Sequence, residues 1–238
     1  MAARGIGLIL AFVPNHVAYD RLLHGPAEQV HGHLTGDPTY QDHLVRFVEN
    51  HDEPRAADAF GPRGPVAAVA ALTQTGARLI HHGQLTGRRT RLPVFLGRNP
   101  DEPTDTTVAG FYRALLGALA DPTFHDGRWR LAETTGWPGS AAENLVAWCW
   151  DGESRWVVVV NLGDRTATGR VRVPLIDLRE RQWRLTDPTH QVSYQRSGHD
   201  LVDGLYVELA PRDWHLWRHD PALDPGAGEA GTNGAGVG

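Results

Sequence analysis

The segment RFVENHDEPR, from Arg46 to Arg55, concentrates side chains that can take part in chemistry. Glu49, His51, Asp52 and Glu53 are ionisable, and they follow the apolar pair of residues 47 and 48. A buried strand that ends in charged side chains has this pattern. Polar residues at the carboxyl ends of parallel strands often mark the active face of an enzyme, so we expect a site here.

A second strand end carries polar residues of a related kind. The apolar run of residues 7–13 leads directly into Asn15 and His16. Carboxylates beside a sugar stabilise an oxocarbenium-like transition state, and imidazoles can hydrogen-bond its hydroxyl groups. A metal site is a rival interpretation, although neither an H-x-x-x-H nor a C-x-x-C spacing supports it. Ordinary polar residues on a strand rim are the third alternative.

The composition is that of an ordinary globular protein. The chain has 238 residues, a formal net charge of −5 and one cysteine, Cys149. The scattered arginines form no basic stripe, so we expect no nucleic-acid partner. A lone cysteine fits a reducing compartment and a place in the core. The N-terminal apolar run is too short to span a membrane, so we predict a cytoplasmic protein without a membrane partner.

The first half of the chain alternates predicted strands with predicted helices. Strands are expected at residues 7–13, 44–48 and 78–80, and helices at residues 65–76 and 104–120. The histidine-rich stretch HGPAEQVHGH, residues 24–33, is expected to be a solvated loop. Strand–helix alternation predicts a parallel sheet of the (β/α) kind.

The second half has a different pattern. Seven short apolar segments follow one another closely, and Gly, Asp and Pro separate them; they are RWRLAET, LVAWCWDG, RWVVVVNLGD, TGRVRVPL, QWRLTDP, LYVELAP and DWHLWRH. This pattern predicts an antiparallel β-sandwich. We therefore divide the chain into an incomplete (β/α) barrel over residues 1–126, a C-terminal β-sandwich over residues 127–218 and a disordered tail over residues 219–238.

Four of these segments resemble the α-amylase superfamily, glycoside hydrolase family 13. GLILAFVPNH is similar to the family's first signature strand, and RFVENHDEPR is similar to its late Asn-His-Asp signature. GARLIHHGQLTGRR resembles the last barrel strand and GFYRALLGAL the helix that closes the barrel. The sandwich resembles the C-terminal β domain, so the resemblance extends to about residue 218.

The resemblance implies roles for individual residues. Asp52 matches the Asp that stabilises the transition state, and His51 and His16 match histidines that bind the sugar. Arg55 and the loop Gln84–Arg88 are expected to line the cleft on weaker grounds. Asn15 matches an Asn that helps to hold a structural calcium ion in some members, but we predict neither metal nor cofactor here. The implied partner is an α-glucoside or an α-glucan oligosaccharide.

Two parts of the family pattern are not present in this sequence. The retaining mechanism needs a nucleophilic carboxylate and an acid/base carboxyl. The family carries them in a G-x-R-x-D pattern and in a Glu-bearing strand, between the first and last signatures. Only 33 residues separate His16 from Asn50 here, and neither pattern occurs among them. In addition, Ala11 stands where the family signature has an Asp.

The predicted barrel also has too few strands to close. A (β/α)8 barrel takes about 200 residues or more, whereas about 126 precede the sandwich. The three predicted strands resemble the third, seventh and eighth of the family barrel. An internal deletion near residues 18–19 and a lost N-terminus explain this pattern most simply. Three strands leave an open apolar edge that a second chain could cover.

These features give a first prediction and two alternatives. The first is a truncated glycosidase or transglycosidase of the α-amylase family that lacks its nucleophile and its acid/base. The second is a non-catalytic carbohydrate-binding or interaction protein built on the β-sandwich, which surface exposure of Trp129, Trp137 or Trp150 would favour. The third is a damaged gene product without a function.

Overall fold

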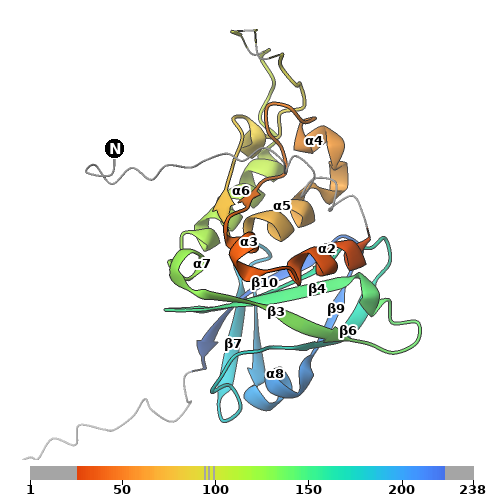
Figure 1. Cartoon of the computed structure of the whole chain (residues 1–238), viewed down its shortest axis with the longest axis vertical. Coiled ribbons are helices and arrows are strands. Elements are labelled where there is room, and N and C mark those ends of the chain that lie inside the picture. Colours follow the sequence, from red (N-terminus) through yellow and green to blue (C-terminus); the bar gives the residue numbers. More distant parts are fainter. Residues whose placement is uncertain (1–25, 94, 96, 99, 223–238) are drawn as a thin grey trace, which may run out of the picture.

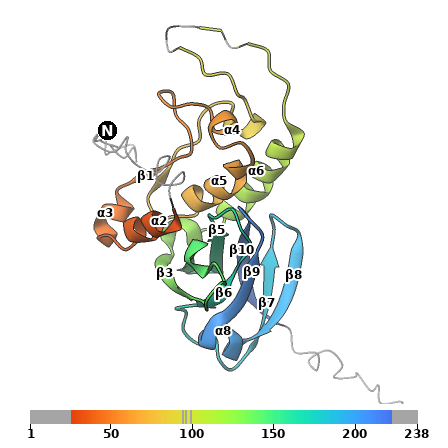
Figure 2. The same cartoon turned by 90° about the vertical axis from the view of Figure 1, so that its right-hand side faces the viewer.

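The computed structural model describes residues 26–93, 95, 97–98 and 100–222. It consists of a curled antiparallel sheet and a group of helices that cover one face of this sheet (Figures 1 and 2). The predicted strand at residues 7–13 lies outside the described residues. None of the helices described is long and apolar enough to cross a membrane.

Most helices come from the first half of the chain. The α-helices are α2 (Ala27–Leu34), α3 (Pro38–Asp42), α4 (Ala56–Ala59), α5 (Gly64–Leu72), α6 (Thr106–Leu119), α7 (Thr123–Asp126) and α8 (Gly198–Gly204). Short 3-10 turns are η3 (Gly61–Arg63), η4 (Gln84–Thr86) and η5 (Ala142–Asn144). The helices predicted at residues 65–76 and 104–120 correspond to α5 and α6. Asp105 caps α6 by accepting hydrogen bonds from the backbone N–H groups of Thr107 and Val108.

The large sheet has eight strands in the order β8-β7-β10-β5-β4-β3-β6-β9, and all neighbours are antiparallel. The strands are β3 (Arg128–Thr135), β4 (Leu145–Asp151), β5 (Arg155–Asn161), β6 (Ala167–Arg172), β7 (Gln182–Asp187), β8 (Val192–Ser197), β9 (Leu205–Leu209) and β10 (Trp214–Pro221). All seven predicted segments are strands. The eighth strand, β8, was not predicted, because VSYQRS is a polar edge strand without a clear apolar run.

The prediction of a sandwich made of two sheets needs correction. Residues 128–132 of β3 pair with β4, whereas residues 133–135 of the same strand pair with β6. One continuous strand therefore joins what would otherwise be two sheets, and the sheet curls (Figure 2). Strand β10 also runs to Pro221, three residues beyond the predicted limit of the sandwich.

The two faces of the sheet bury two separate cores. On β4, Val146, Trp148 and Trp150 face the helices, whereas Ala147 and Cys149 face the inside of the curl. Side chains alternate between faces along a strand, so a strand that is buried on both sides reads as a continuous apolar run. Cys149 is fully buried, as predicted, and burial raises the pKa of its thiol to about 12.

Helix α5 is fastened to the sheet by two tryptophans. The indole N–H groups of Trp148 and Trp150 donate to the Thr73 hydroxyl (3.2 Å) and the Thr73 carbonyl (2.7 Å). Thr73 is the residue that ends α5, where helix carbonyls have no partner within the helix. The helical layer and the sheet consequently share one core as well as directed hydrogen bonds.

The prediction of a solvated loop over residues 24–33 is wrong for the residues of this stretch that the structure describes. Helix α2 occupies most of it, and Ala27, Val30 and Leu34 are buried in the core that faces the sheet. Pro26 is compatible with a helix start, and Gly32 lowers helix propensity by only about 1 kcal/mol relative to Ala. Burial of three apolar side chains on one face is sufficient to offset this cost.

A second, smaller sheet consists of β1 (Val45–Arg46) and β2 (Ala77–Arg78), which pair in parallel. Strand β1 falls within the predicted segment 44–48, whereas β2 shares only Arg78 with the predicted segment 78–80. Each strand is only two residues long. Their parallel pairing fits a fragment of a (β/α) sheet. The more detailed assignment of these strands to the seventh and eighth positions of a barrel stays a prediction.

Candidate functional site

The candidate site lies at the C-terminal ends of β1 and β2. Because the two strands are parallel and in register, with Arg46 opposite Arg78, the segments that follow them leave the sheet at the same edge. The first segment carries Glu49 to Glu53 and the second carries His81 and His82. Glu49 Oε1 lies 3.4 Å from His81 Nδ1, so the two segments touch.

Asn50 turns the chain at the end of β1. Its side-chain Oδ1 accepts hydrogen bonds from the backbone N–H groups of Asp52 (2.8 Å) and Glu53 (3.0 Å). This Asx turn leaves His51 and Asp52 at the surface, where their side chains are 64% and 52% exposed. His51 Nε2 and Asp52 Oδ2 are 3.3 Å apart. The two predicted site residues therefore lie together and are open to a ligand.

Glu49 lies beneath this surface. It is almost fully buried, and its Oε2 accepts a 2.6 Å hydrogen bond from the backbone N–H of Ala56, the first residue of α4. Its Oε1 forms an ion pair with Arg55 Nη2 at 3.0 Å, although no hydrogen bond is directed at this oxygen. Burial raises the pKa of Glu49, and the Ala56 hydrogen bond and the Arg55 charge oppose the increase. The Glu49 carboxylate thus positions its neighbours and is not free to act on a substrate.

Arg55 connects the two segments. Its guanidinium donates to His81 Nδ1 (2.6 Å) and to the carbonyl of His82 (2.9 Å) while it pairs with Glu49. His81 Nδ1 accepts this bond only when the imidazole is neutral there. Burial lowers the pKa of His81, and the positive charges of Arg55, His51 and His82 lower it further. Arg55 was predicted to line the cleft, and the structure places it at the base of a cavity.

Helix α6 supports the segment after β2. The buried Gln84 accepts a hydrogen bond from the His81 backbone N–H (3.2 Å) and donates to the Tyr112 hydroxyl (2.9 Å). Burial raises the pKa of Tyr112 to about 12, so the phenol stays protonated. Gly83 and Gly87, on either side of η4, have φ values of +88° and +70°. This backbone conformation, which favours glycine, folds the loop back over Arg55.

The cavity above Arg55 has a volume of about 190 Å3 and is rich in basic groups. Its charged and titratable lining residues are His51, Arg55, His81, His82, Arg88, Arg91 and Glu102. Asp52 is next to the cavity in sequence but does not line it. Arg88 belongs to the loop that was expected to line the cleft, whereas His81, His82 and Arg91 were not predicted. The His-His pair shortly after Arg78 was a usable signal.

The remaining predicted residues are placed as follows. His16 and Asn15 lie outside the described residues, so the pairing of His16 with His51 stays a prediction. In the part of the chain that the structure describes, His, Cys, Asp and Glu side chains form no group of three or more that could hold a metal ion. Trp150 is buried and Trp129 is half-buried, whereas Trp137 is 48% exposed.

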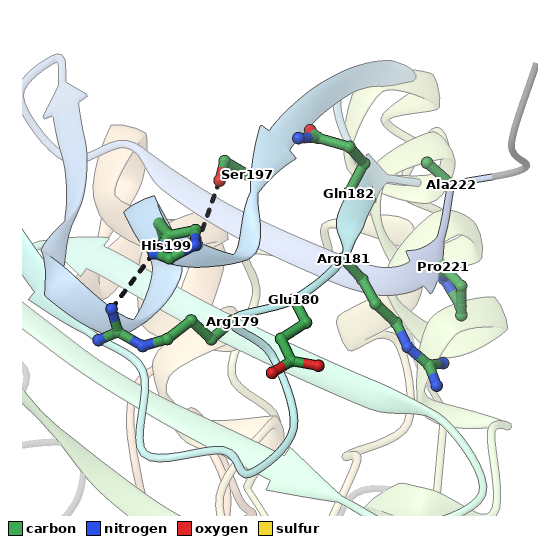
Figure 3. A pocket seen from close by; sticks show the side chains of 8 residues that line it. All are labelled: Arg179, Glu180, Arg181, Gln182, Ser197, His199, Pro221 and Ala222. Carbon is green, nitrogen blue, oxygen red and sulfur yellow. Dashed lines mark hydrogen bonds between the residues drawn. The ribbon is translucent and has the colours of Figure 1, made fainter.

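A larger hollow, of about 470 Å3, lies at the opposite end of the molecule between β7, β8 and α8 (Figure 3). Arg179 reaches across it to His199, with Nη1 and Nδ1 3.2 Å apart, and pairs with Asp203 at 2.7 Å. These side chains are half-exposed and already have partners. This hollow gathers no set of convergent groups comparable to those above Arg55.

No protein-family profile and no curated protein matches this sequence. Solved structures do match. An α-amylase from Anoxybacillus has a TM-score of 0.63 at 12% identity, over 87% of this chain and 46% of that one. A noncanonic maltogenic α-amylase from Thermotoga neapolitana has a TM-score of 0.57 at 17% identity, over 73% and 40%. A debranching enzyme from Nostoc punctiforme, soaked with acarbose, has a TM-score of 0.55 at 16% identity, over 80% and 37%.

The fold is one that α-amylases contain. At 12–17% identity, these matches show a shared fold and no more. The chain spans less than half the length of each of these proteins. The shared fold therefore covers 73–87% of this chain without extending to an entire amylase.

Proposed function

We propose that this chain acts on α-glucosides or α-glucans as part of an α-amylase-type glycoside hydrolase or transglycosidase. The observation that carries the proposal is the position of His51 and Asp52. They leave the C-terminal end of a parallel strand, beside the end of its neighbour, within a fold that amylases contain. Catalytic groups of (β/α) enzymes lie at this edge.

The chemistry of the two side chains suits a sugar. An exposed Asp52 carboxylate can stabilise the positive charge that develops at an anomeric carbon, and His51 can hydrogen-bond a sugar hydroxyl. Acarbose is present in two of the related structures, the Nostoc debranching enzyme and an α-amylase from Geobacillus thermoleovorans, and maltose in a hydrolase from Arthrobacter globiformis. These ligands favour an α-linked glucose oligosaccharide for the present chain.

We do not expect this chain to hydrolyse a glycoside by itself. A retaining mechanism needs two carboxyl groups about 5–5.5 Å apart in addition to the stabilising Asp. Glu49, the nearest buried carboxylate in sequence, is occupied by Arg55 and by the Ala56 N–H. Asp52 would therefore serve as a substrate-contacting residue without a nucleophile and an acid/base from this chain.

The test combines turnover with binding. The purified chain, Asp52→Asn and the neighbouring control Glu53→Gln would be assayed with an activated α-glucoside and titrated with maltotriose in a calorimeter. We expect no turnover by any of them. Maltotriose binding should weaken by about tenfold in Asp52→Asn, since a charged hydrogen bond contributes about 1.5–3 kcal/mol, and should be unchanged in Glu53→Gln. Turnover that Asp52→Asn abolishes would contradict the absence of a nucleophile, and the lack of any sugar binding would contradict the function.

A second candidate function is non-catalytic glucan binding on the sheet. Trp137 and Tyr206 are 48% and 49% exposed, and their ring planes are within 12° of parallel with centroids 6.4 Å apart. Trp137 also lines a shallow hollow of about 530 Å3 together with Ser140 and Glu143. Paired, exposed aromatic faces of this kind suit stacking against sugar rings.

Affinity electrophoresis through a gel that contains amylose separates the two candidates. If the sheet surface binds glucan, Trp137→Ala should lose retardation and Asp52→Asn should keep it. The reverse result favours the strand-end site. Trp129→Phe serves as a tryptophan control, because Trp129 is half-buried and packs against the core.

A further inference from the structure

The cavity above Arg55 collects more positive charge than the side chains around it neutralise. Three guanidinium groups line it, those of Arg55, Arg88 and Arg91, against the single lining carboxylate of Glu102. The Glu102 carboxylate accepts hydrogen bonds from the backbone N–H groups of Arg89 (2.8 Å) and Thr90 (3.0 Å). Most of its hydrogen-bonding capacity is therefore directed to the loop backbone.

Only one of the three arginines forms an ion pair with a carboxylate of the described residues. Arg55 pairs with Glu49 beneath the cavity. Among the described residues, no carboxylate lies within ion-pair distance of Arg88 or Arg91. Hydrogen bonds from the loop lower the pKa of the Glu102 carboxyl, and Arg88 adds to this lowering only through its charge. Two arginines that border one concave surface without an ion pair favour the binding of an anion.

Gly83 allows two of these side chains to approach each other. A Cβ atom at this position would lie 2.5 Å from Arg88 Cδ and 2.7 Å from Arg55 Nη2. The positive φ of Gly83 and the absence of a side chain thus let both arginines pack against the same point of the backbone. An anion bound beside this point of the backbone would be attracted by both positive charges.

The imidazoles point to the same conclusion. His51, His81 and His82 all border the cavity. Burial lowers the pKa of His81, and the positive charges nearby contribute to this lowering. An anion in the cavity would act in the opposite direction and raise the pKa of His81.

We propose that this cavity binds a phosphate group, and that the ligand is a phosphorylated α-glucoside whose sugar lies toward His51 and Asp52. The sugar part rests on the proposed function, whereas the phosphate part rests on the cavity alone. Arginine forks match phosphate oxygens in bidentate geometry. At about 190 Å3 the cavity is smaller than the roughly 300–1,000 Å3 of typical sites for larger organic ligands, which suits a phosphate group better than an oligosaccharide.

Calorimetric titration of the full chain in a low-salt acetate buffer tests the proposal. The probes are inorganic phosphate, sulfate, glucose 1-phosphate, glucose 6-phosphate and maltotriose. The variants are Arg88→Ala and Arg91→Ala, with Arg184→Ala as the matched control, because Arg184 is exposed on β7 in the other sheet. Thermal unfolding of each variant checks that it is folded, and NMR titration of His81 provides a readout that is independent of affinity.

We expect at least one sugar phosphate to bind about tenfold more tightly than maltotriose, inorganic phosphate or sulfate. Arg88→Ala and Arg91→Ala should each weaken that binding by about tenfold, Arg184→Ala should leave it unchanged, and the ligand should raise the pKa of His81. The proposal is overturned if sugar phosphates bind no more tightly than sulfate, or if both cavity variants bind like the control.

Maltotriose binding without phosphate binding leaves the proposed function standing and removes this inference. Phosphate binding without any response to sugar removes the proposed function and leaves an anion site.

Discussion

The curled sheet and the β1–β2 strand pair are stabilised in opposite ways. The sheet buries apolar side chains on both faces of its central strands, and its helical cover adds the tryptophan hydrogen bonds to Thr73. The strand pair has two residues in each strand and depends on buried charged side chains. Arg46, Glu49 and Arg55 are each at most 5% exposed.

The difference follows from what each region has to do. Apolar burial is non-directional and stabilises a large area, so it suits a scaffold. Hydrogen bonds and ion pairs are directional, so they suit loops that must hold particular side chains in place. Arg46, for example, donates to the Thr75 carbonyl (3.0 Å) and thereby connects β1 to the segment before β2. A polar network of this kind also makes the strand pair sensitive to the loss of a single charge.

Replacement of Trp148 by Ala should have the largest effect on stability. Trp148 is fully buried between the sheet and the helices, and truncation of a buried Trp typically costs about 3–5 kcal/mol in the free energy of unfolding. Trp137→Ala is the matched control, because Trp137 is 48% exposed and such surface changes cost about 0.5 kcal/mol or less. Urea unfolding measured by circular dichroism gives both values, and equal losses would refute the shared core.

Replacement of Glu49 by Gln should cost about 3 kcal/mol, because it leaves the buried Arg55 guanidinium without a counter-charge. The chain contains a well-matched control. Glu133 and Arg172 are also 3.0 Å apart, but their side chains are 58–63% exposed. Glu133→Gln should therefore change the free energy of unfolding by about 0–1 kcal/mol. If both substitutions cost the same amount, the stability of the strand pair does not depend on its buried charges.

The free energy of unfolding should also depend on pH through the histidines of the sheet. This change should be smaller than the changes expected for Trp148→Ala and Glu49→Gln. Hydrogen bonds to Asp187 and Asp213 raise the pKa of His190 to about 9, whereas burial lowers the pKa values of His215 and His219 to about 4 and about 3. An unfolded histidine titrates near 6.5. The His190 contribution is complete below pH 6.5 and is lost as pH rises through 9.

The two buried histidines act in the other direction. Below pH 6.5 the unfolded chain takes up protons that folded His215 and His219 do not, so stability falls as pH decreases toward 4 and 3. The free energy of unfolding should consequently be greatest near pH 6.5. His190→Asn should reduce the loss between pH 6.5 and 9 by about 1–2 kcal/mol, a value lowered for the partial exposure of the ring. Urea unfolding at a series of pH values measures this, and an unchanged profile would contradict the role of His190.

Sequence patterns identified the sheet better than they identified the site. The strands from β3 to β7, β9 and β10 have apolar runs. Each run is visible within its own strand, because it reflects the burial of that strand's side chains. The polar edge strand β8 has no such run. The joining of the sheet through β3 depends on which partner each half of one strand meets, and local sequence does not encode that choice.

For the site, the sequence located the end of β1 and the loop of residues 84–88, but not the rest of the cavity. The apolar residues 47 and 48 and the Asn-His-Asp group marked the end of β1, and the structure brings His51, Asp52 and Arg55 to that end. Arg88 and Arg91 reach the same place only because the loop after β2 turns back at Gly83 and Gly87. Charges that meet through a turn of the backbone leave no regular spacing in the sequence.

The attachment of Trp148 and Trp150 to Thr73 has a spectroscopic consequence. Both indoles belong to the sheet, yet their dry surroundings and their hydrogen-bond acceptor are provided by helix α5. Fluorescence from these tryptophans therefore reports whether the helical layer is in place, even though the sheet carries the fluorophores. A red shift of emission that precedes the loss of the β-sheet signal would mark the separation of the two layers.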